Sequence, residues 1–186
     1  MLDRYAEPPR DAATLAARRE ALLDQLGWLE DEATALAPLL AALPAWATDQ
    51  APMPDDLSAK QMFAALAQFD RETYPAWVAA VREQDTPAFE TPALAADPTA
   101  NERALDDLLA DLRSPREALR AVFEAVPAEA WARGATLDGT TTDLYGLALA
   151  VVQRDADVLK TLAYRMHEAD LRPPTPGLDL PKPPQA

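Results

Sequence analysis

An apolar repeat with three- and four-residue spacing recurs in four long stretches of this chain and limits what the chain can fold into. The first stretch carries the repeat at Leu15, Leu22, Leu26, Leu29, Ala33, Leu36 and Leu40. Side chains at this spacing share one face of an α-helix. The repeat therefore predicts four helices, over residues 11–42, 58–83, 101–126 and from about 140 to 169.

Proline marks the segments between the predicted helices. Of the 18 prolines, only Pro38, Pro75 and Pro115 lie inside a periodic stretch. Proline lacks a backbone N–H and clashes with the preceding helical turn, so we expect an irregularity at each of the three. The remaining prolines predict long connections over residues 43–57 and 84–99.

Four helices with one apolar face each are buried most simply in a four-helix bundle. No segment alternates with a period of two for long enough to predict a sheet. The predicted fold class is therefore all-α, a bundle with long connecting loops. We expect one domain over residues 11–170, between an N-terminal extension (1–10) and a proline-rich, flexible tail (171–186).

Charge and composition exclude several classes of partner. The formal net charge of -14, without a cluster of Lys or Arg to offset it, predicts that the chain does not bind nucleic acid. No apolar stretch reaches the roughly 20 residues that span a bilayer, so no membrane segment is expected. The chain has no cysteine and no visible secretory leader, which predicts a cytoplasmic protein.

Few side chains suit catalysis. His167 is the only histidine, and Ser58 and Ser114 are the only serines. Ser58 followed by Gln61 is typical of a capping box, and Ser114 also lies where a helix cap is expected. The sequence therefore predicts no nucleophilic triad. One of the three threonines that precede the last helix is expected to cap it, namely Thr140, Thr141 or Thr142.

Three segments, taken in order and spacing, resemble a known family. They are Ser58-Ala59-Lys60-Gln61-Met62-Phe63-Ala64-Ala65-Leu66, the run from Arg113-Ser114-Pro115-Arg116-Glu117-Ala118-Leu119 to Pro127-Ala128-Glu129-Ala130-Trp131, and Thr140-Thr141-Thr142-Asp143-Leu144. Between Arg19 and His167 the chain resembles the DinB/YfiT-like family of bacterial four-helix bundles. The resemblance implies an up-down-down-up bundle, often a homodimer, and a metalloenzyme class that includes thiol-dependent transferases and a maleylpyruvate isomerase.

Members of this family typically hold a divalent metal, such as zinc or nickel, with three histidines. Matched onto this chain, those positions fall on Ala65, Arg154 and Val158, none of which can serve as such a ligand. A register shifted by one residue places the later pair on Gln153 and Asp157. The resemblance therefore implies a vacated metal-site pocket without a metal cofactor, with three neighbours: Gln61, Phe69 and Asp155.

Arg154 is the most informative of these positions, because it interrupts the apolar face of the last helix. A guanidinium there needs a carboxylate, a bound anion or a route to water.

Two further groups of residues have alternative interpretations. One group consists of four carboxylates that could form a metal site or an acid-base pair: Asp70, Glu72, Asp155 and Asp157. Tryptophans could line a ligand pocket but are more often core or loop anchors, and these are Trp28, Trp46, Trp77 and Trp131.

The sequence thus predicts a DinB-like protein that is metal-free and non-catalytic in the family sense. We expect it to bind a small acidic ligand or to associate with a second copy of itself as a homodimer. The alternative is an enzyme of the thiol-dependent transferase or isomerase type, which uses the retained pocket without the three histidines. In that case Arg154 would hold a small acid.

Overall fold

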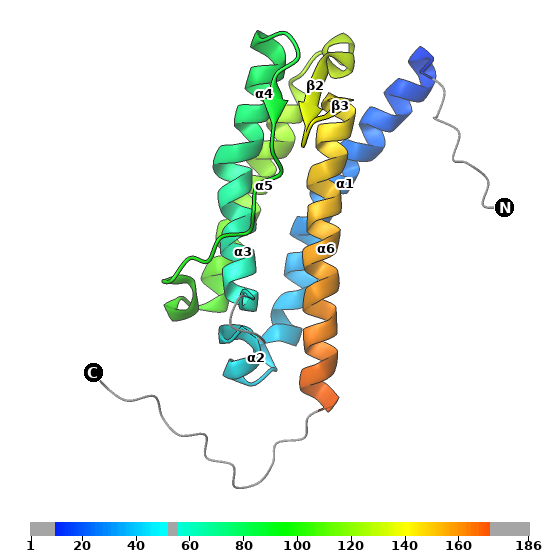
Figure 1. Ribbon diagram of the computed structural model, residues 1–186. Coiled ribbons are helices and arrows are strands. Elements are labelled where there is room, and N and C mark those ends of the chain that lie inside the picture. Colours follow the sequence, from blue (N-terminus) through cyan, green and yellow to red (C-terminus); the bar gives the residue numbers. More distant parts are fainter. Residues whose placement is uncertain (1–9, 52–55, 172–186) are drawn as a thin grey trace, which may run out of the picture.

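The computed structural model describes residues 10–51 and 56–171, and shows a bundle of long helices with a small sheet at one end (Figure 1). The expected N-terminal extension and tail lie outside the described residues, apart from Arg10 and Leu171. The elements in chain order are α1 (Ala12–Ala41), α2 (Ala45–Asp49), α3 (Ala59–Gln68), the π-helix η1 (Phe69–Thr73), α4 (Tyr74–Glu83), β1 (Ala88–Phe89), the 3₁₀-helix η2 (Ala100–Glu102), α5 (Leu105–Glu124), the 3₁₀-helix η3 (Ala128–Ala132), β2 (Gly134–Leu137), β3 (Thr140–Asp143) and α6 (Leu144–Leu171).

The four predicted helices are confirmed, because α1, the run from α3 to α4, α5 and α6 occupy the expected stretches. Asp11 caps α1 by accepting from the backbone N–H groups of Ala13 and Thr14 at 3.1 and 3.0 Å. Pro38 and Pro115 lie within α1 and α5 without ending either helix. Ser114 therefore lies inside α5, and its prediction as a cap is wrong.

The second predicted helix contains one wide turn. The capping box is confirmed: Ser58 Oγ accepts from the Gln61 N–H at 3.1 Å, and Gln61 Oε1 accepts from the Ser58 N–H at 2.9 Å. Five residues of π-helix, η1, then join α3 to α4 directly before Pro75. Proline cannot donate to a carbonyl one turn earlier, so the irregularity expected at Pro75 takes the form of this wide turn.

A three-stranded sheet is present, and the prediction of a chain without strands is wrong. Its order is β1-β2-β3, with β1 parallel and β3 antiparallel to β2. Asp138 and Gly139 connect β2 to β3 with φ values of 50° and 75°, as a tight two-residue hairpin turn requires. The strands have two to four residues, too short for an alternating pattern to show.

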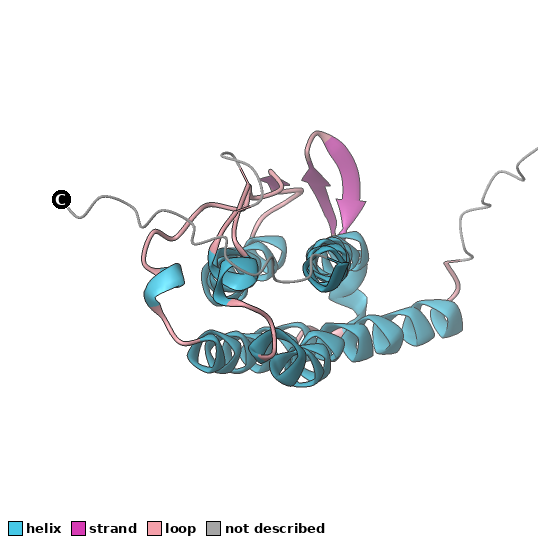
Figure 2. Cartoon of the chain, turned by 90° about the horizontal axis from the view of Figure 1, so that it is seen from below, coloured by secondary structure: helices cyan, strands magenta, loops and turns pink. Residues whose placement is uncertain are grey.

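Thr140, Thr141 and Thr142 pair in β3 and do not cap α6, so that prediction is also wrong. The carboxylate of Asp143 does so instead, by accepting from the Gly146 N–H at 3.0 Å. The sheet lies near one end of the bundle (Figure 1), and a view along the bundle shows it to one side of the helices (Figure 2). It therefore adds a wall next to α4 and α6.

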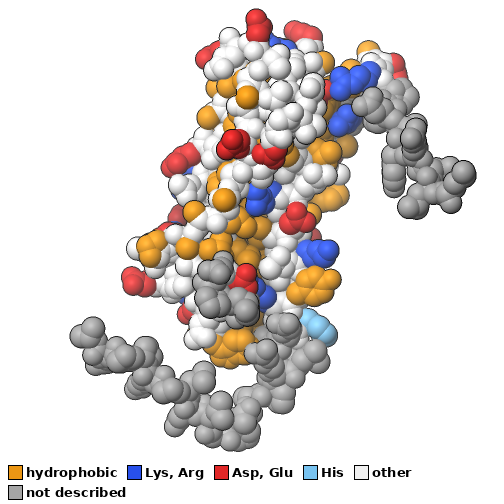
Figure 3. Space-filling model, in the orientation of Figure 1, with side chains coloured by type: hydrophobic (Ala, Val, Ile, Leu, Met, Phe, Trp, Pro, Cys, Tyr) orange, Lys and Arg blue, Asp and Glu red, His pale blue; other side chains and the backbone are white. Residues whose placement is uncertain are grey.

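The chain path brings distant segments together. In Figure 1, α1 and α6 run downward and both α3–α4 and α5 run upward, because residues 84–104 return along the bundle. Helix α1 packs against α5 and α6, and α3 packs against α5. A strip of apolar side chains is visible between α3–α4 and α6, with charged groups interspersed (Figure 3). No helix among the described residues is long and apolar enough to span a membrane.

The apolar core consists of two clusters. The upper cluster, next to the sheet, includes Leu26, Leu119 and Val151, and the lower cluster, next to α2, includes Leu29, Leu112 and Val158. Trp77 and Trp131 are buried in the upper cluster, as expected for core anchors. The expectation is wrong for Trp28, which is 58% exposed on α1, and Trp46 in the connection after α1 is 37% exposed and is not a core residue.

Candidate functional site

A buried ion triad separates the two apolar clusters. Arg116 of α5 lies between the carboxylates of Asp70 and Asp155, and the three residues are 0%, 1% and 5% exposed. Arg116 Nε and Nη2 donate to Asp70 at 2.7 and 3.0 Å, and Nη1 and Nη2 donate to Asp155 at 2.5 and 2.9 Å. Nη1 also donates to the Leu26 carbonyl at 3.5 Å. All five guanidinium N–H groups therefore have an acceptor.

The triad joins all four parts of the bundle. Asp70 comes from η1, Arg116 from α5, Asp155 from α6 and the carbonyl of Leu26 from α1. Along each helix the charged residue stands between members of the two apolar clusters. The alignment therefore forms a single polar layer across the core, held by two bidentate arginine–carboxylate pairs.

Burial dominates the electrostatics of this layer. Removal from water raises the pKa of Asp70 to about 7, although the adjacent Arg116 guanidinium acts in the opposite direction. Removal from water also raises the pKa of Asp155. Burial disfavours the charged form of Arg116, but the two carboxylates outweigh it and raise the Arg116 pKa. Arg116 therefore stays cationic, whereas Asp70 and Asp155 both keep their protons to a higher pH than an ordinary carboxyl group does.

Stability is expected to fall as the pH rises from about 4 to about 7. In that window the folded protein keeps a proton on Asp70 that the unfolded chain has lost, since the pKa is about 7 in the fold and 3.8 in the reference state. For one proton the slope reaches at most about 1.4 kcal/mol per pH unit. Urea unfolding of the wild type and of Asp70→Asn across this range measures it. An equal slope in the two proteins would contradict the assignment.

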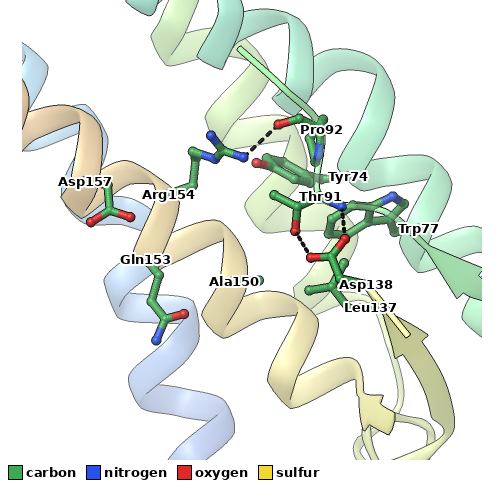
Figure 4. A pocket seen from close by; sticks show the side chains of 10 residues that line it. All are labelled: Tyr74, Trp77, Thr91, Pro92, Leu137, Asp138, Ala150, Gln153, Arg154 and Asp157. Carbon is green, nitrogen blue, oxygen red and sulfur yellow. Dashed lines mark hydrogen bonds between the residues drawn. The ribbon is translucent and has the colours of Figure 1, made fainter. Parts of the chain in front are cut away.

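A pocket of about 440 Å³ opens between α4 and α6, beside the sheet (Figure 4). We call it the α4–α6 pocket. It is lined by Tyr74, Trp77, Thr91, Pro92, Leu137, Asp138, Ala150, Gln153, Arg154 and Asp157. Four different parts of the chain supply these residues: α4, the connection after β1, the β2–β3 hairpin and α6.

One wall of the α4–α6 pocket is aromatic. The rings of Tyr74 and Trp77 meet edge to face with centroids 5.1 Å apart, and Trp77 stacks on Phe89 of β1 at 5.2 Å. The connection after β1 is held in place by Thr91, whose N–H and Oγ1 donate to the carboxylate of Asp138 at 2.8 and 2.6 Å. The wall is therefore built on a fixed hairpin.

Arg154 extends from α6 toward Pro92 and Tyr74 (Figure 4) and is half-buried. Its Nη2 donates to the Pro92 carbonyl at 2.7 Å (Figure 4). Among the described residues no carboxylate lies within ion-pair distance of it. The sequence predicted that Arg154 interrupts the apolar face of the last helix. In the structure Asp155 does so, because the position four residues after Val151 points further into the core than the position three residues after it.

The other predicted site residues are spread over the bundle. Ala65 lines a separate pocket of about 290 Å³, next to Arg71 and Arg103. Val158 is buried in the lower cluster and Phe69 in the upper one. Gln61 stays at the start of α3 in the capping box. Asp155 belongs to the triad, whereas Gln153 and Asp157 of the shifted register line the α4–α6 pocket with Arg154.

The donor set of the pocket does not fit a divalent metal. It offers two carboxylates, and one of them, Asp138, is engaged by Thr91. The guanidinium of Arg154 opposes a cation in the same space. Asp70 and Asp155 face Arg116, and Glu72 lines the other pocket, so the predicted carboxylate group is separated. Among the side chains of residues 10–51 and 56–167, no three of His, Asp or Glu could share an ion.

Sequence reasoning missed Arg116 and Tyr74, although a signal for both exists. Arg116 follows Leu112 by four positions and precedes Leu119 by three, so it lies on the apolar face of its helix. Tyr74 follows Asp70 by four positions and lies on the same inward face. A cation and carboxylates on inward helical faces indicate a buried ion pair. The Asp138–Gly139 dipeptide is likewise a recognised hairpin signal.

Comparison with known proteins supports the architecture. No protein-family model matches the sequence, and no curated protein matches it. Among solved structures, one that matches is described as YfiT from Bacillus subtilis, a probable metal-dependent hydrolase with an unusual four-helix bundle topology. It superposes with a TM-score of 0.63 at 15% sequence identity, over 87% of this chain and 94% of that chain. This likeness establishes a shared four-helix-bundle fold.

Proposed function

We propose that this chain is a divergent four-helix bundle of the DinB/YfiT-like type, in up-down-down-up order, that binds a small organic acid in the α4–α6 pocket without a metal. The observation that carries the proposal is Arg154. It is a half-buried cation that faces a pocket, and within the described residues it has no carboxylate partner. A partly buried guanidinium is stabilised by an anionic partner, and a ligand anion in the pocket can supply one.

The geometry of Arg154 suits an anionic ligand. A guanidinium has five N–H groups in one plane, and the Pro92 carbonyl uses one of them. The hydrogen bond to Pro92 holds the group in place, so little side-chain freedom is lost on binding. The remaining N–H groups can donate to both oxygens of a carboxylate.

The lining of the pocket also favours a small ligand. Small-molecule sites combine apolar and aromatic walls with a few fixed polar groups, and their volumes begin at about 300 Å³. The α4–α6 pocket has this composition, with Trp77 and Leu137 as apolar lining residues and Arg154 as a polar one. Self-association, the other predicted role, stays a prediction, for which Trp28, Leu39, Trp46 and Tyr164 are the exposed apolar side chains.

The test is a panel of small organic acids in ligand-observed NMR with wild type and Arg154→Gln. We expect at least one acid to bind the wild type, and the substitution to weaken it about tenfold or more, since a hydrogen bond to a charged group contributes about 1.5–3 kcal/mol. Arg113→Gln is the matched control, because Arg113 is exposed on α5. The proposal is overturned if no acid binds, or if Arg154→Gln binds as well as the control. Turnover of a bound acid would instead favour the enzyme alternative.

A further inference from the structure

We propose that the hydroxyl of Tyr74 is a second anchor in the α4–α6 pocket, and that Tyr74 and Arg154 together select a singly charged carboxylate on a planar apolar body. The inference rests on the proposed function and adds the ligand class. It assigns the recognition of the anion to two donors from two helices, α4 and α6.

The side chain of Tyr74 is buried in the aromatic wall of the α4–α6 pocket. Its side chain packs against Phe69 and Trp77, and the residue is only 2% exposed. No acceptor or donor for its hydroxyl lies among the described residues. Yet Tyr74 lines the pocket, and in Figure 4 its hydroxyl points toward the guanidinium of Arg154. Among the described residues, the fully buried side-chain atoms without a partner are Arg19 Nε and Trp131 Nε1, so the Tyr74 hydroxyl, which is not one of them, is open to the pocket and can donate there to a ligand atom.

The state of the hydroxyl suits an anion. Burial, and next the carboxylates of Asp155 and Asp70, raise the pKa of Tyr74 above its ordinary value. The group is therefore neutral at physiological pH and available as an O–H donor. A carboxylate has two oxygens, so one can accept from the Arg154 fork and the other from the Tyr74 hydroxyl.

The walls next to these donors favour a particular shape and polarity for the part of the ligand beyond its carboxylate. Trp77 and Leu137 line the same pocket, and the indole is already held by Phe89. A rigid aromatic face packs best against a flat apolar group, in offset or edge contact. A planar hydrocarbon body therefore gains more here than a flexible polar one.

The surrounding charges limit the ligand to one negative charge. Arg154 is the only cation among the lining residues, while Asp138 and Asp157 line the same pocket. Asp70 and Asp155 also act on Tyr74, and the single cation Arg116 between them offsets only one of the two carboxylates. The whole chain carries a net charge of -14. A second negative charge, as on a phosphate monoester, would be repelled from several directions.

Calorimetric titrations with phenylacetate, phenylacetamide and phenyl phosphate test the selection. For the wild type we expect phenylacetate to bind at least tenfold more tightly than the neutral amide or the dianion. Tyr74→Phe should weaken phenylacetate about tenfold or more, the effect of one hydrogen bond to a charged group. Tyr164→Phe is the matched control, since Tyr164 is 63% exposed on α6. Melting temperatures establish that each variant is folded.

The outcomes separate the two proposals. If acids bind through Arg154 but Tyr74→Phe binds phenylacetate like the wild type, the second anchor is wrong and the proposed function stands. The same holds if phenyl phosphate or an aliphatic acid binds through Arg154 and phenylacetate does not. If no acid binds in an Arg154-dependent way, both proposals fall.

Discussion

Replacing Arg116 by methionine is expected to lower the free energy of unfolding by about 3–5 kcal/mol. The substitution leaves the carboxylates of Asp70 and Asp155 in the core without the guanidinium that pairs with both. A buried charge without its partner carries its full desolvation penalty. The loss is a large part of the stability of a typical domain, about 5–15 kcal/mol. Guanidinium chloride unfolding at pH 7 measures it.

Two variants control this prediction. Arg113→Met removes an arginine from the same helix, but Arg113 is exposed and donates to the exposed Thr34. Its effect should stay within about 0.5 kcal/mol. The triple variant Asp70→Leu, Arg116→Met, Asp155→Leu should recover most of the lost stability, because apolar side chains replace buried ion groups at little cost. A mild effect of Arg116→Met, equal to that of Arg113→Met, would show that the triad does not stabilise the fold.

Replacing Trp131 by alanine is expected to cost about 3–5 kcal/mol in the free energy of unfolding. Trp131 is 0% exposed and packs against Phe123 and Tyr145 at ring distances of 5.8 and 5.1 Å. The guanidinium of Arg19 lies 5.4 Å from the centre of its ring. Truncation therefore leaves a large cavity where α1, α5 and α6 meet. Thermal and urea unfolding measure the loss.

Trp28→Ala is the matched control, since it removes the same side chain from a position that is 58% exposed. Its effect should stay within about 0.5 kcal/mol. Trp131→Phe should cost less than Trp131→Ala, because it keeps a ring and removes an indole N–H that has no partner among the described residues. Similar losses for Trp28→Ala and Trp131→Ala would contradict the role of Trp131 as a core anchor.

The regular part of the fold could be predicted from the sequence, and the irregular part could not. The apolar repeat is a local property, so it placed α1 and α6 and showed that Leu144, Leu147, Val151, Val158 and Leu162 face inward, all of which are buried. The sheet was not predicted, because strands of two to four residues depend on their pairing partners elsewhere in the chain, as Ala88 does on Thr136. Pro115 was expected to disturb α5, but the helix runs through it.

The candidate site was also only partly predictable from the sequence. Arg154 was singled out from the sequence, and the structure places it in a pocket. Its partners there could not be inferred, because Pro92 is 62 positions away in the chain. Ala65 and Val158 do not line that pocket with Arg154, although helical spacing and the resemblance place them together. Small differences in helix rotation decide which of two adjacent residues, Arg154 or Asp155, points inward.

By itself, the sequence determined the helices, their lengths and their inward faces, because helical periodicity and capping act over a few residues. It also determined the electrostatic character of the chain. Only the tertiary structure decided that Asp70 and Asp155, which lie 46 and 39 positions from Arg116, meet around one guanidinium. It likewise decided that Tyr74 and Arg154 line the same pocket. Such contacts depend on how helices rotate and pack against one another, and that geometry is set by the whole core at once.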